Sequence, residues 1–302
     1  MTDHTSQSTA SAEAPERGGA LQNLTVLGSG VLGSQIALQA AFHGKDVTIY
    51  DISETALASL SARWDYLAPL YVQDLTDATP ERMAEALGRI RTTSDLADAV
   101  VDADLIIEAV PEVLEVKQQT WAEVGRLALE ETIFATNSST FLPSDIAQST
   151  GRPSRFLALH FANEIWRLNI GEVMGHPDTD PDAYEAVAGF AEEIGMVPIR
   201  VLREQPGYVL NSLLVPFLWA AGRLLVRGVA DPETVDRTWR ISTGAPLGPF
   251  QFLDIIGMMT PYNLLEDSDD SELRAFADLI KRDYIETGRL GKGAGAGFYD
   301  YS

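Results

Sequence analysis

The chain contains no cysteine, which excludes disulfides, cysteine-ligated metal sites and thiol nucleophiles, and we predict no metal site. Basic residues are scarce, because 22 Lys and Arg stand against 44 Asp and Glu, a formal net charge of −22. Such a chain has little with which to neutralise a phosphate backbone, so no nucleic-acid partner is expected. No stretch approaches the roughly 18 consecutive apolar residues of a membrane span, so no membrane partner is expected either.

At 302 residues the chain exceeds the usual size of a single core, and two domains are expected. Residues 1–20 have no charged-then-apolar signal pattern. We therefore predict a disordered leader over residues 1–20 and a cytoplasmic location.

The most informative stretch is residues 24–51, LTVLGSGVLGSQIALQAAFHGKDVTIYD, which orders a strand, a glycine turn, a helix, a second strand and an acid. Gly28 permits the tight turn after the strand, and Gly30 lets the backbone approach a pyrophosphate. Gly33 lets the helix pack close to the sheet. The order of these features predicts a dinucleotide-binding unit.

The helix that follows the glycine turn offers unpaired N–H groups and a positive dipole to phosphates. Asp51 ends the second strand, where a carboxylate accepts hydrogen bonds from ribose hydroxyls and repels a 2′-phosphate. The predicted cofactor is therefore NAD rather than NADP. Its predicted contacts in this unit are Gly28, Gly30, Val31, Leu32, Gly33 and Asp51.

After Asp51 the apolar spacing predicts a helical excursion over residues 53–75 and 79–90, with Thr79 as cap and Pro80 at the first helical position. Strands are then predicted within residues 90–95, 104–110, 132–137, 155–161, 170–174 and 196–201. Helices are predicted at residues 96–101, 113–129, 143–148 and 181–194. This alternation indicates an α/β, Rossmann-type domain with a doubly wound parallel sheet over residues 21–204.

From residue 205 the character changes, and residues 205–302 contain helical patterns without a convincing strand. We predict an all-helical C-terminal domain that serves the substrate and dimerisation. Its first helix, residues 208–226, is apolar nearly all round, which a small domain buries with difficulty. A homodimer through this domain is the expected use, and a central core helix is the alternative.

The chain holds four histidines, so a catalytic histidine has few candidates. His160 stands near the end of a predicted strand, and ligands in open α/β sheets bind beyond the carboxyl ends of strands. Glu172 lies in an otherwise apolar segment, where a carboxylate is costly unless it is paired. Pairing with His160 would fix the imidazole tautomer and stabilise the imidazolium. A satisfied core glutamate remains the alternative.

Several longer motifs accompany these residues in a fixed order. They are IIEAVPEVLEVK from residue 106, NSSTF from 137, HFAN from 160, GEVM from 171, PGYVLNSLLVPFL from 206, GPFQFLDIIG from 248 and GKGAGAGFYDY from 291. With this set the chain resembles the L-3-hydroxyacyl-CoA dehydrogenases from Leu24 to Tyr301.

The resemblance implies roles for individual residues. His160 is the implied general base and Glu172 its orienting partner, while Ser139 and Asn211 position the substrate. The implied contacts at the nicotinamide end of the cofactor are Glu112, Lys117 and Asn137. The implied reaction is NAD-dependent interconversion of a short-chain (3S)-3-hydroxyacyl thioester of CoA and its 3-oxoacyl thioester, with the thioester as the small-molecule partner.

Two segments depart from the family pattern beside the expected substrate pocket. Residues 52–72 hold one basic residue, Arg63, where members that use CoA often carry lysines, and Glu164 follows Asn163 where the family has proline. Aromatic residues available for stacking on adenine are Trp64, Tyr66 and Tyr71, and arginines available for a phosphate are Arg63, Arg82, Arg89 and Arg167.

Other functions stay open because of these departures. The acyl group could be carried by a carrier protein, or the substrate could be a free polar 3-hydroxy acid, as for the carnitine- and gulonate-oxidising relatives. A third alternative is a non-catalytic NAD-binding protein, which has no need for the four residues of the catalytic set. Dehydrogenases that use a catalytic lysine in the helix opening the second domain are disfavoured, because residues 208–226 contain no lysine.

Overall fold

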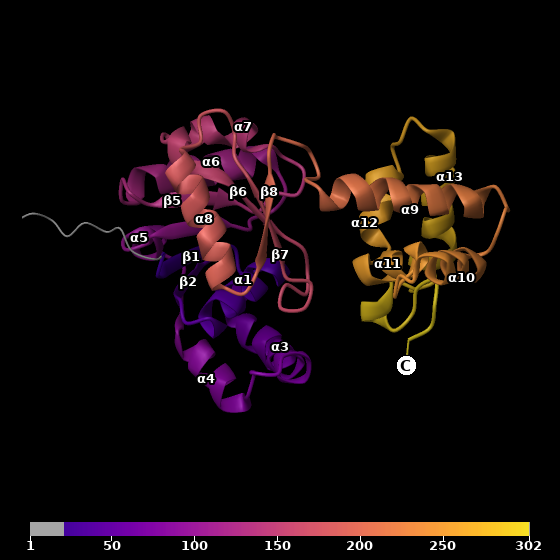
Figure 1. The fold of residues 1–302 in the computed structure, drawn as a ribbon, viewed down its shortest axis with the longest axis horizontal. Helices are drawn as coiled ribbons and strands as arrows, with labels where there is room; N and C mark the ends of the chain where they lie inside the picture. Colours follow the sequence, from indigo (N-terminus) through magenta and orange to yellow (C-terminus); the bar gives the residue numbers. More distant parts are fainter. Residues whose placement is uncertain (1–20, 302) are drawn as a thin grey trace, which may run out of the picture. The chain divides into compact units, whose positions relative to one another are not determined.

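The computed structural model describes residues 21–301, so the predicted disordered leader, residues 1–20, lies outside the described residues. The chain forms two compact units that divide between Pro206 and Gly207 (Figure 1). The first unit contains an eight-stranded sheet in the order β3-β2-β1-β4-β5-β6-β7-β8. The strands are β1 (Asn23–Leu27), β2 (Asp46–Tyr50), β3 (Ile90–Thr93), β4 (Leu105–Glu108), β5 (Ile133–Thr136), β6 (Phe156–Phe161), β7 (Ile170–Met174) and β8 (Val197–Val201).

Helices cover both faces of this sheet, as the alternating sequence pattern predicts. One core lies between the sheet and a layer that includes α1 (Val31–Phe42) and α8 (Pro181–Glu193). A second core lies under α5 (Leu96–Val100), α6 (Leu114–Leu127) and α7 (Pro143–Ile146). The predicted Rossmann-type, doubly wound architecture is confirmed.

Alternate residues of the central strand β4 feed these two cores. Leu105 and Ile107 lie in the first core, and Ile106 lies in the second. A strand buried on both faces reads as a continuous apolar run, which explains the sequence LII before Glu108.

The sheet is parallel, as predicted, except at one pair of strands. Strands β6 and β7 are antiparallel, whereas every other neighbouring pair is parallel. Residues 162–169 connect them without a helix or strand, and a parallel crossover needs about a dozen residues or more. The short connection therefore folds the chain back on itself and pairs residues close in sequence.

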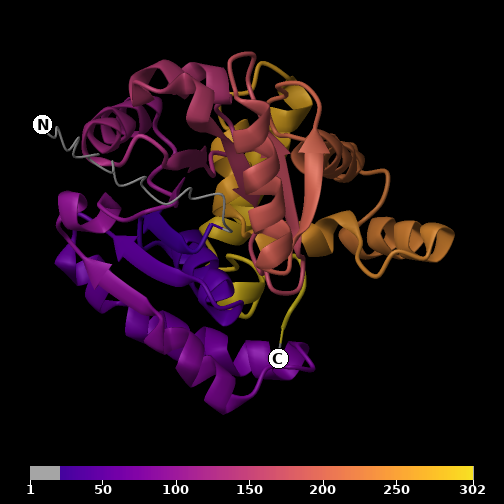
Figure 2. The same ribbon diagram turned by 60° about the vertical axis from the view of Figure 1, so that its left-hand side comes forward.

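The helical excursion consists of α2 (Glu54–Ala58), α3 (Leu60–Asp74) and α4 (Pro80–Gly88), coloured indigo to purple in Figure 1 and Figure 2. Helices α3 and α4 pack against α1. Thr79 caps α4, since its Oγ1 accepts a hydrogen bond from Arg82 N at 3.2 Å, and Pro80 is the first helical residue, as predicted. Tyr71 of α3 is fully buried and its hydroxyl donates to Gln39 Oε1 of α1 at 2.7 Å.

The second unit is helical, as predicted, and contains α9 (Leu210–Val226), α10 (Pro232–Thr243), α11 (Pro249–Ile256), α12 (Met259–Leu265) and α13 (Ser271–Ile280). Two buried carboxylates fasten its C-terminal segment. Asp254 accepts hydrogen bonds from Phe298 N at 2.7 Å and Tyr301 Oη at 2.8 Å. Asp236 accepts from Tyr299 Oη at 2.9 Å. Burial, together with the bond to Asp236, raises the pKa of Tyr299 far above its ordinary value, so this tyrosine stays a hydrogen donor.

Candidate active site

The glycine turn after β1 has the close contacts that its sequence predicts. Gly28 has a φ of 107°, and a Cβ there would lie 2.6 Å from Ala109 O. A Cβ on Gly33 would lie 2.0 Å from Gly28 O, so the first turn of α1 passes directly over the end of β1. Gly30, by contrast, has no atom within 4 Å of its missing Cβ, so the backbone is open at the position expected to face a pyrophosphate.

The N-terminus of α1 is suited to an anion. Gly30 is its N-cap residue and provides no side-chain cap, and the first turn contains no acidic residue. Its N–H groups and dipole are therefore available to phosphate oxygens. Val31, at the first helical position, is 58% exposed, and Leu32 packs against the core of the sheet.

Asp51 accepts three hydrogen bonds, two of them from Ser29 of the glycine turn. Ser29 donates from its backbone N–H at 2.9 Å and from its hydroxyl at 2.7 Å to Asp51 Oδ2. Ser53 N donates to Asp51 Oδ1 at 2.9 Å. The glycine turn, which lacks a Cβ at Gly30, and the uncapped end of α1 fit the pyrophosphate of NAD. The fixed carboxylate of Asp51 fits a ribose.

The register of β6 and β7 places His160 directly opposite Glu172. Both side chains are buried, with side-chain exposures of 4% and 1%, and His160 Nδ1 lies 2.9 Å from Glu172 Oε2. Because a carboxylate accepts at Nδ1, the proton of the neutral imidazole belongs on that nitrogen. Nε2 is then left with the lone pair that a general base requires.

The second ring nitrogen of His160, Nε2, contacts Ser139. Ser139 Oγ lies 3.0 Å from His160 Nε2, so the hydroxyl donates to the ring in the tautomer fixed by Glu172. Ser139 follows β5, and His160 stands near the end of β6, which is parallel to β5. The chain Ser139–His160–Glu172 thus lies at the same edge of the sheet as the glycine turn, where α/β proteins bind ligands.

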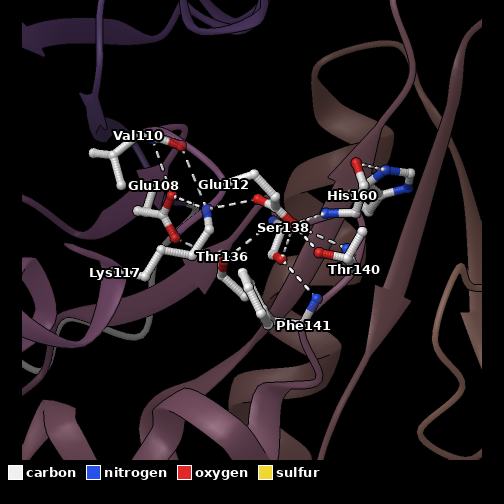
Figure 3. A network of polar contacts seen from close by, with 10 residues as sticks. Glu108, Val110, Glu112, Lys117, Thr136, Ser138, Thr140, Phe141 and His160 are labelled. Carbon is white, nitrogen blue, oxygen red and sulfur yellow. Dashed lines mark hydrogen bonds and ion pairs between the residues drawn. The ribbon is translucent and has the colours of Figure 1, made fainter. Parts of the chain in front are cut away.

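Glu112 and Lys117 belong to a polar network that includes Glu108, Thr136 and Ser138 (Figure 3). Lys117 is 1% exposed, and its Nζ lies 2.6 Å from Glu108 Oε1 and 3.1 Å from Glu112 Oε2. Asn137, the third residue predicted at the nicotinamide end, is buried, and its Oδ1 accepts from Phe161 N at 2.8 Å. Asn137 therefore joins the ends of β5 and β6.

The sequence prediction did not include Glu108, Thr136, Ser138 or Thr140, which all belong to this network. Glu108 ends the apolar strand β4 at 0% exposure, so a buried carboxylate was the available signal. The partners come from β5 and α6, and spacing along the chain does not reveal such tertiary contacts.

Asn211, predicted to position the substrate, lies in α9 of the second unit. Its backbone N–H donates to Gly207 O at 3.0 Å. Gly207 has a φ of 78°, so the Pro-Gly pair turns the chain into α9 through a left-handed residue.

Three aromatic residues of the two departing segments, Trp64, Tyr71 and Trp166, pack against the core of the sheet. Trp166 is 6% exposed and stacks on the buried Tyr71 with ring centroids 5.1 Å apart, while its Nε1 donates to Asp74 Oδ2 at 2.9 Å. Tyr71 is therefore not available to stack on adenine. Trp64 also packs against the core, and its Nε1 donates to Ser34 O at 3.3 Å.

The loss of proline after Asn163 has a backbone reason. Glu164 has a φ of 61°, which a proline ring cannot adopt. Glu164 N donates to Gln35 Oε1 at 2.8 Å, which helps to hold the unusual conformation. Among the arginines predicted to meet a phosphate, three are ion-paired: Arg82 with Asp77, Arg89 with Asp46, and Arg167 with Glu164.

The described part of the chain has two further properties. None of its helices is long and apolar enough to cross a membrane. Within residues 21–301 there is no group of three His, Asp or Glu side chains arranged to hold a metal ion.

A Rossmann-type sheet with an open glycine turn and a histidine–carboxylate pair at one edge fits an NAD-dependent oxidoreductase. Comparison with known proteins identifies its family. The NAD-binding domain of 3-hydroxyacyl-CoA dehydrogenase matches residues 23–205, and the C-terminal domain of the same enzymes matches residues 207–301. The chain belongs to the 3-hydroxyacyl-CoA dehydrogenase family.

Individual relatives cover nearly the whole chain. Human mitochondrial hydroxyacyl-coenzyme A dehydrogenase is 33% identical over 310 residues, which cover 100% of this chain and 97% of the relative. The structure of a diketoreductase that acts on dicarbonyl compounds is 54% identical with a TM-score of 0.90, covering 94% of this chain and 100% of the other. The (S)-3-hydroxybutyryl-CoA dehydrogenase of Ralstonia eutropha is 29% identical with a TM-score of 0.78, covering 94% and 100%.

Proposed function

We propose that the protein interconverts a short-chain (3S)-3-hydroxyacyl thioester of CoA and its 3-oxoacyl thioester, with NAD as the redox partner. The observation that carries the proposal is the continuous contact from Ser139 Oγ through the His160 ring to Glu172 Oε2, at 3.0 and 2.9 Å. This arrangement supplies a base with a fixed tautomer at the edge of the sheet where the glycine turn lies.

In this mechanism His160 Nε2 takes the proton of the C3 hydroxyl. Ser139 Oγ, which is 3.0 Å from Nε2, orients the same oxygen and keeps it in line with the imidazole. Bound NAD supplies the hydride acceptor at its nicotinamide, and NADH the hydride donor in the reverse direction. Glu172 stabilises the imidazolium, because its carboxylate lies 2.9 Å from Nδ1 in a buried setting.

We further propose that Asn211 of α9 binds the substrate carbonyl and that Gly28, Gly30, Val31, Leu32, Gly33 and Asp51 bind the adenosine and pyrophosphate part of NAD. The supporting observations are the open position at Gly30 and the fixed carboxylate of Asp51. The cytoplasmic location stays a prediction, since the human relative is named as mitochondrial.

A second candidate substrate is a dicarbonyl compound or free 3-oxo acid that carries no CoA. The similarity to a diketoreductase at 54% identity favours it. So does the scarcity of free cations, because Arg63 is the one basic residue in 52–72 and Arg82, Arg89 and Arg167 are paired with acids.

The deciding experiment follows NADH oxidation with acetoacetyl-CoA beside free acetoacetate and pentane-2,4-dione. Turnover that is fastest with the thioester supports the CoA substrate. Turnover with the two small carbonyl compounds and none with the thioester would reject it and leave the diketone class. No NADH oxidation with any of the three would contradict both candidates.

We also propose a homodimer through the helical unit. A groove of about 380 Å³ between α9 and α10 is lined mainly by apolar side chains, among them Phe217, Leu224 and Trp239. Leu213 of α9 and Ile241 of α10 are 71% and 77% exposed. Uncovered apolar surface of this kind is typical of a subunit interface.

Light scattering at increasing protein concentration tests the dimer. Ile241→Glu should shift the molar mass toward a monomer, because an isologous contact buries the new charge twice. Val101→Glu is the matched control, since Val101 is 48% exposed at the end of α5 in the other unit. A wild-type chain that stays monomeric at all concentrations would reject the dimer.

A further inference from the structure

Glu108 is a fully buried carboxylate to which the proposed mechanism gives no task. A charge in this position needs partners, and Glu108 has three. Val110 N and Lys117 Nζ donate to Oε1 at 3.0 and 2.6 Å, and Thr136 Oγ1 donates to Oε2 at 2.7 Å. Glu108 thereby ties β4 to β5 and to α6.

Two routes lead from Glu108 to the turn that carries Ser139 (Figure 3). On the first, Lys117 Nζ bridges Glu108 Oε1 and Glu112 Oε2. On the second, Thr136 Oγ1 accepts a hydrogen bond from Ser138 N at 3.1 Å. Both routes end on the segment that follows β5.

A single carboxylate oxygen of Glu112 accepts four hydrogen bonds from this turn. Its Oε1 accepts from the hydroxyls of Ser138 and Thr140 and from the backbone N–H groups of Ser139 and Thr140, the latter two at 3.0 and 2.9 Å. Burial alone would raise the pKa of Glu112, but the bonds from Ser138 and Thr140 and the charge of Lys117 outweigh it, so the carboxylate is ionised at neutral pH.

The ammonium group of Lys117 is fully engaged inside the protein. Its three protons meet oxygens of Glu108 at 2.6 Å, Glu112 at 3.1 Å and the Val110 carbonyl at 3.4 Å. Removing one carboxylate would redirect this buried cation toward the other. The orientation of Glu112 therefore depends on Glu108.

We propose that Glu108 and Glu112 are positioning residues that hold the Ser139 hydroxyl against His160 Nε2, with Lys117 bridging them. The inference rests on the proposed function, in which Ser139 and His160 contact the substrate oxygen. It differs from a cofactor-contact role for Glu112 in what it predicts: a change in turnover rather than in NADH affinity, transmitted through Ser139.

A double-mutant cycle in the full-length protein tests this transmission. Glu112→Gln should lower kcat about tenfold, because small displacements of positioning groups are costly, and should leave the Kd of NADH within about twofold. In a Ser139→Ala background the same substitution should lower kcat by less than about twofold. Glu108→Gln should follow the same pattern, since it acts on the same turn.

Glu115→Gln is the matched control. Glu115 stands two residues before Lys117 on the exposed face of α6, and its Oε1 accepts a hydrogen bond from Gln119 Nε2 at 3.1 Å. The kcat of the Glu115→Gln variant should equal that of wild type. If a glutamate variant does not fold, Thr140→Val carries the test, because it removes one of the bonds to Glu112 without changing a charge.

The proposal would be overturned if the losses in kcat from Glu112→Gln and Ser139→Ala multiply fully in the double variant. It would also be overturned if the defect of Glu112→Gln lies in the Kd of NADH. A readout without substrate separates it from the proposed function. The 15N chemical shift of His160 Nε2 should move in Glu112→Gln toward its value in Ser139→Ala, because the first variant displaces the serine hydroxyl and the second removes it. An unchanged shift would reject the positioning role even if the enzyme reduces acetoacetyl-CoA, and a changed shift would support it even if that substrate is wrong.

Discussion

The cofactor side and the catalytic side of the same sheet edge are built in different ways. On the cofactor side the important feature is space, because Gly28 and Gly33 have backbone oxygens within 2.6 and 2.0 Å of the positions where a Cβ would stand. On the catalytic side the important feature is charge, because buried carboxylates hold His160 at 2.9 Å and Lys117 at 2.6 Å.

The two sides should be sensitive to different kinds of substitution. A site defined by missing side chains fails when an atom is added, and the failure appears in cofactor affinity. A site defined by paired charges fails when a partner is removed, since the remaining charge is buried without compensation. Substitutions on the two sides should therefore change different measured quantities.

The largest effect is expected on the catalytic side from His160→Ala. General base catalysis contributes about 10²- to 10⁴-fold, so kcat should fall by an amount in that range. The Kd of NADH, measured by fluorescence titration, should stay near the wild-type value because the glycine turn is untouched. Weakened NADH binding with retained turnover would mean that His160 belongs to the cofactor side.

Glu172→Gln should reduce kcat less, by about 10- to 100-fold, because it keeps a side chain beside Nδ1 but removes the charge that stabilises the imidazolium. Kinetics with saturating NADH check this, and circular dichroism checks that the buried substitution leaves the fold intact. A turnover rate equal to that of wild type would refute the pairing as a contribution to catalysis.

On the cofactor side, Gly30→Ala and Gly33→Ala form a matched pair. Both should weaken NADH binding about tenfold or more, since one places a methyl group at the pyrophosphate and the other displaces the turn. Only Gly33→Ala should also lower the melting temperature, because its Cβ would meet Gly28 O at 2.0 Å whereas the Cβ of Gly30 meets nothing within 4 Å. Gly88→Ala, which is equally open, is the control. Equal melting temperatures for the two variants would show that the turn yields without cost.

The two sides were also unequally predictable from the sequence. The cofactor side lies within residues 24–51, so its strand, turn, helix and acid appear as one local pattern. The catalytic side joins Ser139 from the turn after β5, His160 from β6 and Glu172 from the middle of β7. The pairing of His160 with Glu172 was expected from the cost of a buried carboxylate, but the antiparallel register that produces it was not.

Tertiary packing determines contacts that the sequence pattern does not predict. Trp166 and Tyr71 stand in segments that depart from the family, yet they stack on each other inside the core. Glu108 ends an apolar strand, and its partners Lys117 and Thr136 lie on other elements. Contacts of this kind depend on how elements meet, which periodicity along one element does not encode.

The smallest effect is expected at Asp51. This residue places a charge on the cofactor side of the sheet edge, which otherwise depends on the absence of side chains. Asp51→Asn keeps one oxygen, which can still accept from Ser29, and places an NH2 group where Oδ1 accepts from Ser53 N. It removes the charge that should repel a 2′-phosphate, so the preference for NADH over NADPH in kcat/KM should fall about tenfold. Asp51→Ala should weaken the preference as much and also raise the KM for NADH, since it removes the oxygens that we propose bind the ribose. If the two variants keep the wild-type preference, Asp51 supports only the Ser29 turn, and cofactor choice is made by shape alone.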